Sequence, residues 1–207
     1  MSVAVLLVAA GYLAGSMPFG YWIVRLLRGE DIRLHGSGNI GGTNVWRSFG
    51  ARFGVPVIFL DILKGLIPAL IASLTRGALV AVLAGAAAML GHWRPLFLGF
   101  RRGGKMVATC GGAVIGIAPL VAAVGVVVWA VVFVAGRYAS LASILAAASL
   151  APAAILLGQP LLVIIFVGAA ALAIIWLHRA NIGRLARGQE HRFRLWRRFR
   201  WMSTGRA

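Results

Sequence analysis

Long apolar segments separated by short polar stretches dominate the pattern of hydrophobic and polar positions in this chain. Seven such segments cover residues 3–27, 55–73, 78–99, 106–117, 120–134, 141–157 and 161–177. A helix needs about 20 apolar residues to cross the ~30 Å hydrocarbon core of a bilayer, and most of the segments approach that length. The pattern therefore predicts an all-α membrane protein, a bundle of seven transmembrane helices.

Residues 106–134 allow two interpretations. Pro119 divides this region, and its total length is too great for one crossing of ordinary thickness. We interpret it as two spans joined by a tight external turn at residues 116–119, the first span being short or partly re-entrant. One long kinked helix is the alternative, and it would reverse the orientation of every later segment.

Basic residues are distributed very unevenly around these segments. With the N-terminus outside, seven spans place the tail from Arg179 onward and nearly all other Lys and Arg residues on the cytoplasmic side, leaving only Arg76 in an external loop. Membrane proteins keep their basic residues in cytoplasmic loops. The charge pattern thus supports an odd number of spans, an external N-terminus and a cytoplasmic C-terminus.

Composition strengthens the membrane interpretation. Charged residues make up 12% of the chain and its mean hydropathy is +0.92, whereas about 25% of residues are charged in soluble proteins. We expect one polytopic membrane domain, residues 1–193, and a basic cytoplasmic tail, residues 194–207. The net charge of +17 fits loops that face anionic lipid and anionic substrates. Nucleic-acid binding is not expected because no motif for it is present.

A glycine-rich polar loop lies between the first and second apolar segments. It contains Gly36, Ser37, Gly38, Asn39, Gly41, Gly42, Thr43, Asn44 and Arg47. Backbone amides freed by glycine can face one concavity together with hydroxyl, carboxamide and guanidinium groups, which is an arrangement suited to a phosphate. An ordinary turn between helices remains the alternative, since the Walker spacing is absent.

A second cluster on the same side precedes the segment 106–117. Gly103 and Gly104 come directly before Lys105, so we expect free amides at a positive helix end to face an anion, with Lys105 adding a full charge. A flexible hinge carrying a topology-determining lysine is the alternative.

A third cluster follows the last apolar segment. His178 and Asn181 are three residues apart and share a helix face, with Arg184 one turn further on. A histidine at a membrane interface also serves as an amphipathic anchor. Glu190, surrounded by arginines, fits the centre of a salt-bridge cluster better than a general base.

Asp61 and Lys64 lie three residues apart inside the second apolar segment. Ionisable groups at that depth are costly unless they are paired or functional. We expect a structural ion pair that holds helices near the site.

Other chemistries lack their motifs. The single cysteine, Cys110, excludes an internal disulfide and a Cys-based zinc site, and no metal or other cofactor is expected. Neither a Gly-x-Ser-x-Gly elbow nor a His-Glu-x-x-His or His-x4-Asp pattern occurs. A carrier for a phosphorylated metabolite could use the same cations and glycines, but it needs a path to both sides, and the outer half offers only Arg76.

Several stretches, in the same order, resemble the bacterial acyl-phosphate:glycerol-3-phosphate acyltransferase family. They are residues 15–20, 31–45 with Arg47, 61–65, 91–92 with Pro95 and Phe97, 103–105 with 107–109, 137–138 with 140–144, and 178–190. The resemblance implies a seven-helix enzyme of the bacterial inner membrane with its active site on the cytoplasmic side. It implies transfer of a fatty acyl group from acyl phosphate to the 1-hydroxyl of glycerol 3-phosphate, and we expect a monomer in the lipid bilayer.

The resemblance also assigns roles to residues. It implies that Ser37, Arg47, Lys105, His178 and Asn181 are catalytic and surround the phosphates. It implies substrate binding by Gly36, Gly38, Asn39, Thr43, Asn44, Gly103, Gly104 and Arg184, and structural roles for Asp61, Lys64 and Glu190.

The chain departs from the family pattern beside Lys105. Arg101 and Arg102 stand where one lysine is usual, and Met106 replaces a glycine. An extra residue and a new side chain next to a phosphate loop could alter the fit of the donor. A paralogue with changed substrates therefore stays open.

Overall fold

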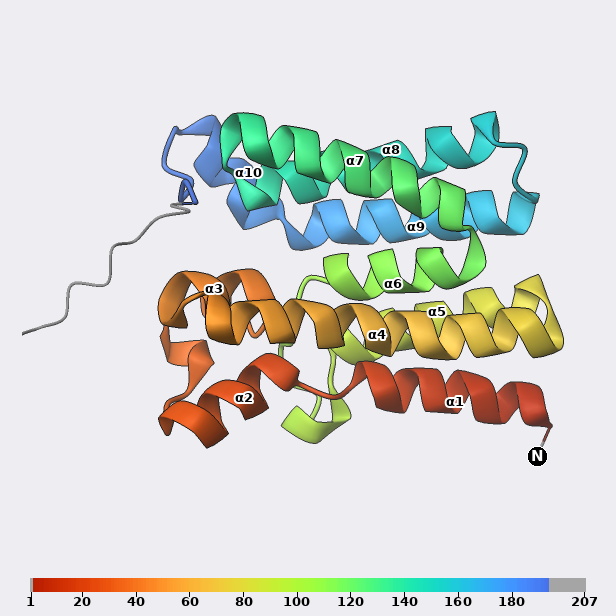
Figure 1. Ribbon diagram of the computed structural model, residues 1–207, viewed down its shortest axis with the longest axis horizontal. Coiled ribbons are helices and arrows are strands. Elements are labelled where there is room, and N and C mark those ends of the chain that lie inside the picture. Colours follow the sequence, from red (N-terminus) through yellow and green to blue (C-terminus); the bar gives the residue numbers. More distant parts are fainter. Residues whose placement is uncertain (1, 194–207) are drawn as a thin grey trace, which may run out of the picture.

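The computed structural model describes residues 2–193, and all regular elements in that range are helices (Figure 1). They are α1 (Val3–Gly15), α2 (Phe19–Arg28), η1 (Ile32–Leu34), α3 (Gly42–Phe49), α4 (Ala51–Arg76), α5 (Ala78–Trp93), η2 (Leu96–Leu98), α6 (Val107–Ile117), α7 (Pro119–Gly136), α8 (Ala139–Leu156), α9 (Leu161–Leu177) and α10 (Arg179–Ala186). Each of the seven expected apolar segments is helical over nearly all of its length. The expected tail at residues 194–207 lies outside the described residues.

The first apolar segment is broken, where the sequence led us to expect one continuous helix. Its two parts, α1 and α2, are separated at residues 16–18, because Pro18 supplies no amide hydrogen and disfavours a helical conformation at Met17. The freed carbonyl oxygen of Met17 accepts a hydrogen bond of 2.9 Å from Lys64 Nζ on α4. A buried polar side chain thus stabilises the break.

Small residues let the helices pack closely. A Cβ atom on Gly15 of α1 would collide with the carbonyl oxygen of Ala88 on α5. Between α4 and α6, a Cβ on Gly65 or Gly112 would likewise collide with a carbonyl oxygen of the facing helix. Small residues at these positions therefore let the helix backbones approach closely, which makes the bundle compact.

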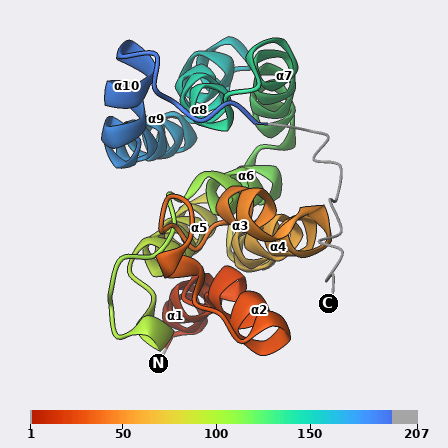
Figure 2. The same cartoon turned by 90° about the vertical axis from the view of Figure 1, so that its left-hand side faces the viewer.

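Two groups of helices face each other (Figures 1 and 2). Helices α1 to α6 form one group and α7 to α10 form the other, and the short connection at Ala118 joins them. Buried residues of both groups form a continuous apolar cluster, including Val114 on α6, Val121 on α7 and Val167 on α9. The turn expected at residues 116–119 is present, because α6 ends at Ile117 and α7 begins at Pro119.

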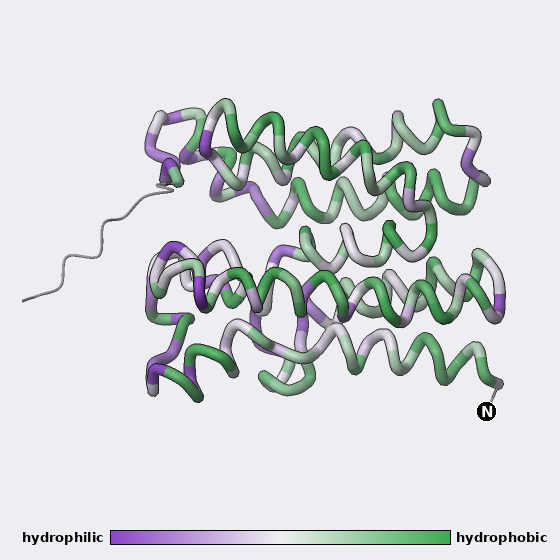
Figure 3. Tube along the Cα trace, viewed as in Figure 1, coloured by the Kyte–Doolittle hydropathy of each residue, from purple (hydrophilic) through white to green (hydrophobic). Residues whose placement is uncertain are grey.

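The described residues contain several helices able to span a membrane. Five candidate spans are long and apolar enough, with α1 and α2 counted together, and the bent pair α9–α10 makes a sixth. Helix α6, with 11 residues, is too short for a full crossing by itself. Hydrophilic residues gather at the end of the bundle that carries α2, α3 and α10 (Figure 3). The protein is therefore a multi-pass helical membrane protein with one strongly polar end, while the number of seven crossings stays a prediction.

Candidate active site

A cavity of about 410 Å³ lies between the two groups of helices. Its polar lining comprises Ser37, Asn39, Thr43, Asn44, Arg47, Asp61, His92, Lys105, Ser140, Ser143, His178, Asn181 and Glu190. An apolar arm continues between α6, α7 and α8 as far as Val114, Ala122 and Leu150. All five side chains expected to be catalytic line this one cavity, although they come from distant parts of the sequence.

The glycine-rich loop has a defined conformation, organised by Asn44. The carboxamide nitrogen of Asn44 donates to the carbonyl oxygens of His35 and Asn39, at 3.0 and 2.8 Å. Its oxygen accepts a 3.0 Å hydrogen bond from the amide of Ser37. Gly36 has a φ of 58° and lies so close to this oxygen that a Cβ atom would not fit. Asn44 thus fixes the position of Ser37, and its own polar atoms are used within the loop.

A hydrogen-bonded chain connects the second and third clusters. Lys105 Nζ donates to Asn181 Oδ1, and Asn181 Nδ2 donates to Glu190 Oε1 at 2.8 Å. Glu190 also accepts hydrogen bonds from Ser140 Oγ at 3.0 Å and from Arg184 Nε at 2.7 Å. The geometry agrees with the expectation that Glu190 is the centre of a salt-bridge cluster. Arg184, predicted to bind substrate, reaches the site only through this carboxylate and does not line the cavity.

The electrostatics of this region favour an anionic ligand. Burial lowers the pKa of Lys105 to about 8, although Glu190 opposes that shift. Burial also lowers the pKa of Arg47, whose Nε has no hydrogen-bond partner within the described part of the chain. Burial tends to raise the pKa of Glu190, but hydrogen bonds from Asn181, Ser140 and Arg184 outweigh it and the net shift is downward. A phosphate would supply the countercharge that these partly desolvated cations lack.

His178 has a defined tautomer when it is neutral. Its Nδ1 lies 2.8 Å from the carbonyl oxygen of Ile174, and because a carbonyl only accepts, Nδ1 carries the hydrogen. The remaining nitrogen, Nε2, is then free to accept a proton. His178 is buried beside the end of α9 and lines the cavity, so Nε2 faces the place where a ligand would lie. Burial and the charge of Lys105 lower the pKa of His178 to about 4, which keeps the imidazole neutral but weakens it as a base at neutral pH.

The amides of Gly103 and Gly104 are not free, and the expectation that they face an anion is wrong. Gly103 donates to the carbonyl oxygen of Trp93 at 2.8 Å, and Gly104 donates to that of His92 at 2.9 Å. Helix α6 begins only at Val107. These glycines do not line the cavity. Their sequence pattern fits a close approach of two backbones as well as it fits a phosphate loop, and only the packing distinguishes the two.

Some residues of the site were not predicted from the sequence. Ser140 and Ser143 line the cavity from α8, and their spacing of three on an apolar helix could have revealed them, since it puts both on one face. His92 also lines the cavity but is separated from Lys105 by an irregular segment, so no periodic pattern connects the two. Gly36 and Gly38, by contrast, shape the loop through positive φ angles and do not line the cavity.

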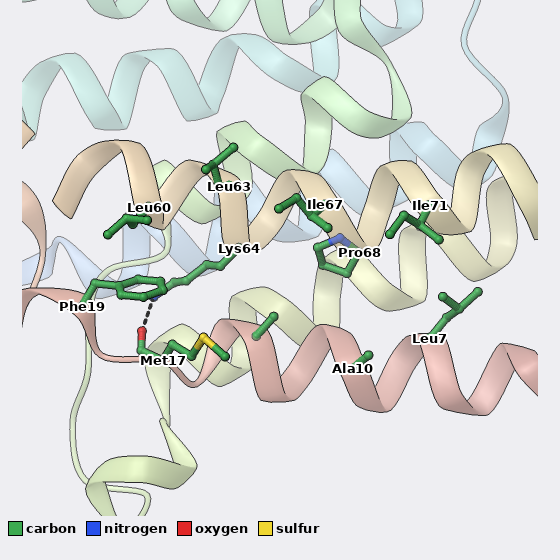
Figure 4. A pocket seen from close by; sticks show the side chains of 11 residues that line it. Leu7, Ala10, Met17, Phe19, Leu60, Leu63, Lys64, Ile67, Pro68 and Ile71 are labelled. Carbon is green, nitrogen blue, oxygen red and sulfur yellow. Dashed lines mark hydrogen bonds between the residues drawn. The ribbon is translucent and has the colours of Figure 1, made fainter. Parts of the chain in front are cut away.

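The expected ion pair of Asp61 and Lys64 is present and buried, with 2.7 Å between Nζ and Oδ1. Lys64 lies at one end of a second, almost wholly apolar crevice of about 350 Å³ between α1 and α4, where Figure 4 shows its hydrogen bond to Met17. Because the ammonium group is already paired twice, this crevice offers no free charge to a polar ligand.

Fold and site together define a multi-pass helical membrane protein whose cationic cavity opens into an apolar arm. A sequence model of the family described as glycerol-3-phosphate acyltransferase matches residues 5–188. A glycerol-3-phosphate acyltransferase of Aquifex aeolicus is 46% identical over 92% of this chain and 99% of its own length, and one of Roseiflexus sp. is 47% identical over 92% and 95%. The chain belongs to the glycerol-3-phosphate acyltransferase family.

Solved structures agree with this assignment. The crystal structure of PlsY (YgiH), an integral membrane glycerol 3-phosphate acyltransferase, in its glycerol 3-phosphate form has a TM-score of 0.89 and 46% identity, covering 93% of this chain and 96% of that one. The lysophosphatidic acid form has a TM-score of 0.86 and 44% identity with the same coverage. This chain is a membrane enzyme that acylates glycerol 3-phosphate, the reaction that begins phospholipid synthesis.

Proposed function

We propose that the acyl donor is an acyl phosphate and that the acyl group is transferred to the 1-hydroxyl of glycerol 3-phosphate. The products are then 1-acylglycerol 3-phosphate and inorganic phosphate. The observation that carries this proposal is the continuity of the cationic cavity, around Lys105 and Arg47, with the apolar arm that ends near Leu150. An acyl phosphate combines the same two chemical characters in one molecule.

Two phosphate groups require several cations and hydrogen-bond donors. Arg47, Lys105, Ser37 and Asn181 line the polar part of the cavity, and we assign them to the phosphates of donor and acceptor. Asn39, Thr43, Gly41 and Gly42 complete the binding surface, while Gly36 and Gly38 shape the loop through their positive φ angles. Gly103, Gly104 and Arg184 contribute indirectly, by holding Lys105 and Glu190 in place.

The proposed chemistry is direct attack on an activated acyl group. The glycerol oxygen forms a bond to the carbonyl carbon of the donor, and the bond from that carbon to the phosphate oxygen breaks, with inorganic phosphate leaving. The proton of the hydroxyl passes to His178 Nε2 or to a substrate phosphate. Positioning and electrostatic stabilisation suffice, since the donor is a mixed anhydride, and no acyl-enzyme, metal or cofactor takes part.

We further propose the topology inferred from the charges. Residues 1–193 form one domain with seven crossings, α6 being the short one, and the N-terminus lies outside the bacterial inner membrane. The active site then faces the cytoplasm, and the enzyme acts as a monomer. Gathering of the hydrophilic residues at one end of the bundle (Figure 3) supports a single polar face. Labelling of cysteines introduced at Arg76 and at Arg187, in intact cells and in inverted vesicles, tests this topology.

The test of function incubates the purified protein with palmitoyl phosphate and labelled glycerol 3-phosphate and detects lysophosphatidate, with palmitoyl-CoA in a parallel reaction. We expect product with palmitoyl phosphate only. Arg47→Ala should abolish most activity. Arg76→Ala is the matched control and should retain activity, because Arg76 is the last residue of α4 and does not line the cavity. Product formed only with palmitoyl-CoA would refute the donor, and trapping of an acylated Ser37 would refute the direct mechanism.

A further inference from the structure

His92, near the end of α5, is a buried polar residue to which the proposed reaction assigns no role. It lines the site cavity and is 4% exposed. Its Nδ1 has no hydrogen-bond partner within the described residues and lies 3.7 Å from Asp61 Oδ1. Asp61 is already paired with Lys64 at 2.7 Å. A hydrogen bond to the ion pair therefore does not explain the histidine.

The segment that carries Lys105 is built against His92. The His92 carbonyl oxygen accepts a hydrogen bond of 2.9 Å from the amide of Gly104, and Asn39 Nδ2 donates one of 3.4 Å to the carbonyl oxygen of Gly103. The imidazole itself lies directly beneath Gly104, so that a Cβ atom there would collide with Nε2, Cε1 and Cδ2 of the ring. Both the backbone and the ring of His92 thus determine where the chain passes before Lys105.

Lys105 has little freedom beyond this point. Its Nζ donates to Asn181, which is held in turn by Glu190. A shift of the preceding turn would move the ammonium group away from Asn181, and misplacement of about 1 Å is enough to lower a rate by about a hundredfold. The rate of the reaction therefore depends on the position of the turn that precedes Lys105.

Resting on the proposed function, in which Lys105 neutralises a substrate phosphate, we propose that His92 is a positioning residue for Lys105. Its imidazole packs directly against Gly104, and this contact is possible only because Gly104 has no side chain. The role is mechanical, and His92 does not transfer a proton in the reaction.

The experiment measures kcat/KM against pH for the parent and for His92→Ala, His92→Gln, Gly104→Ala and the double variant His92→Ala/Gly104→Ala. Gly112→Ala is the matched control. The methyl group that it adds collides with the backbone of Ile62 on α4, and Gly112 lies further along α6, away from Lys105. Thermal unfolding in detergent reports folding of each variant. The alkaline limb of the kcat/KM–pH profile reports the deprotonation of Lys105. The charged groups that act on its ammonium group are Glu190, Arg184, Arg102 and Arg47.

We expect Gly104→Ala to lower kcat/KM by about a hundredfold and His92→Ala by about tenfold, with the double variant close to His92→Ala alone, because the methyl group then enters the space left by the ring. His92→Ala should also move the alkaline limb to higher pH, since a displaced Lys105 is better solvated. His92→Gln, which keeps a side chain of similar reach, should lie nearer to the parent, and Gly112→Ala should change stability without moving the limb.

Parental kcat/KM and an unmoved alkaline limb in folded His92→Ala would overturn the proposal, as would multiplicative losses in the double variant. If His92→Ala does not fold, Gly104→Ala decides, because its added methyl group meets the same ring: parental kcat/KM and an unmoved alkaline limb in folded Gly104→Ala would overturn the proposal. An inactive parent with palmitoyl phosphate would instead refute the proposed donor, and the series is then measured with palmitoyl-CoA, so the two failures are distinguishable.

Discussion

Replacement of Met106 by glycine has two opposing effects on stability: it relieves backbone strain and it removes a buried side chain. Met106 has a φ of 67°, in the left-handed region that favours glycine, and it precedes α6. Its side chain is nevertheless buried in the apolar cluster that joins the two groups of helices. A left-handed conformation costs an ordinary residue about 1–2 kcal/mol, whereas removal of a buried methionine side chain costs about 2–5 kcal/mol.

The larger of these two energies decides the sign of the effect. Met106→Gly relieves the strain but loses the packing, so we expect a net destabilisation of about 2 kcal/mol, the difference between the middle of the two ranges. Met106→Ala loses nearly the same packing and keeps a Cβ atom at positive φ, so it should be less stable than Met106→Gly by about 1 kcal/mol. The alanine variant is thus the control that isolates strain from packing.

Equilibrium unfolding of the three proteins in detergent micelles measures both differences. Because Met106 does not line the cavity, the preference for donor chain length should be the same in all three. An alanine variant as stable as the glycine variant would refute the strain argument. A glycine variant more stable than the parent would show that the side chain contributes less than its burial indicates.

Three further predictions concern the site. Burial lowers the pKa of Lys105 to about 8, so the positive charge of its ammonium group is lost as the pH rises through that value. The KM for glycerol 3-phosphate should therefore increase above about pH 8. Lys105→Arg, which stays charged, should flatten this rise in a KM–pH profile. Glu190→Ala removes the acceptor of Asn181 and Arg184 and should lower stability by about 3 kcal/mol in detergent unfolding, while an unchanged midpoint would contradict the role of Glu190 as the centre of the cluster. Gly125→Leu should narrow the apolar arm beside Leu150 and lower kcat/KM for palmitoyl phosphate by about fourfold per displaced methylene, with acetyl phosphate as the unaffected comparison.

The sequence by itself determined the helical segments and the polar end of the bundle. Spans such as residues 55–73 and 161–177 are recognisable because their length and apolar composition match the bilayer, and the one-sided placement of basic residues follows from insertion into the membrane. The pairing of Asp61 with Lys64 was also predictable, because two ionisable groups three residues apart in an apolar helix have few other partners.

Only the tertiary structure decided what the glycines and the unpaired polar residues do. Gly103 and Gly104 read as a phosphate loop in sequence, yet their amides bind carbonyl oxygens at the end of α5. The contact of His92 with Gly104, and the approach of Ser140 to Glu190, join residues that are distant in sequence. Periodicity describes one helix at a time, whereas these contacts depend on how several helices pack, so no pattern along the chain contains them.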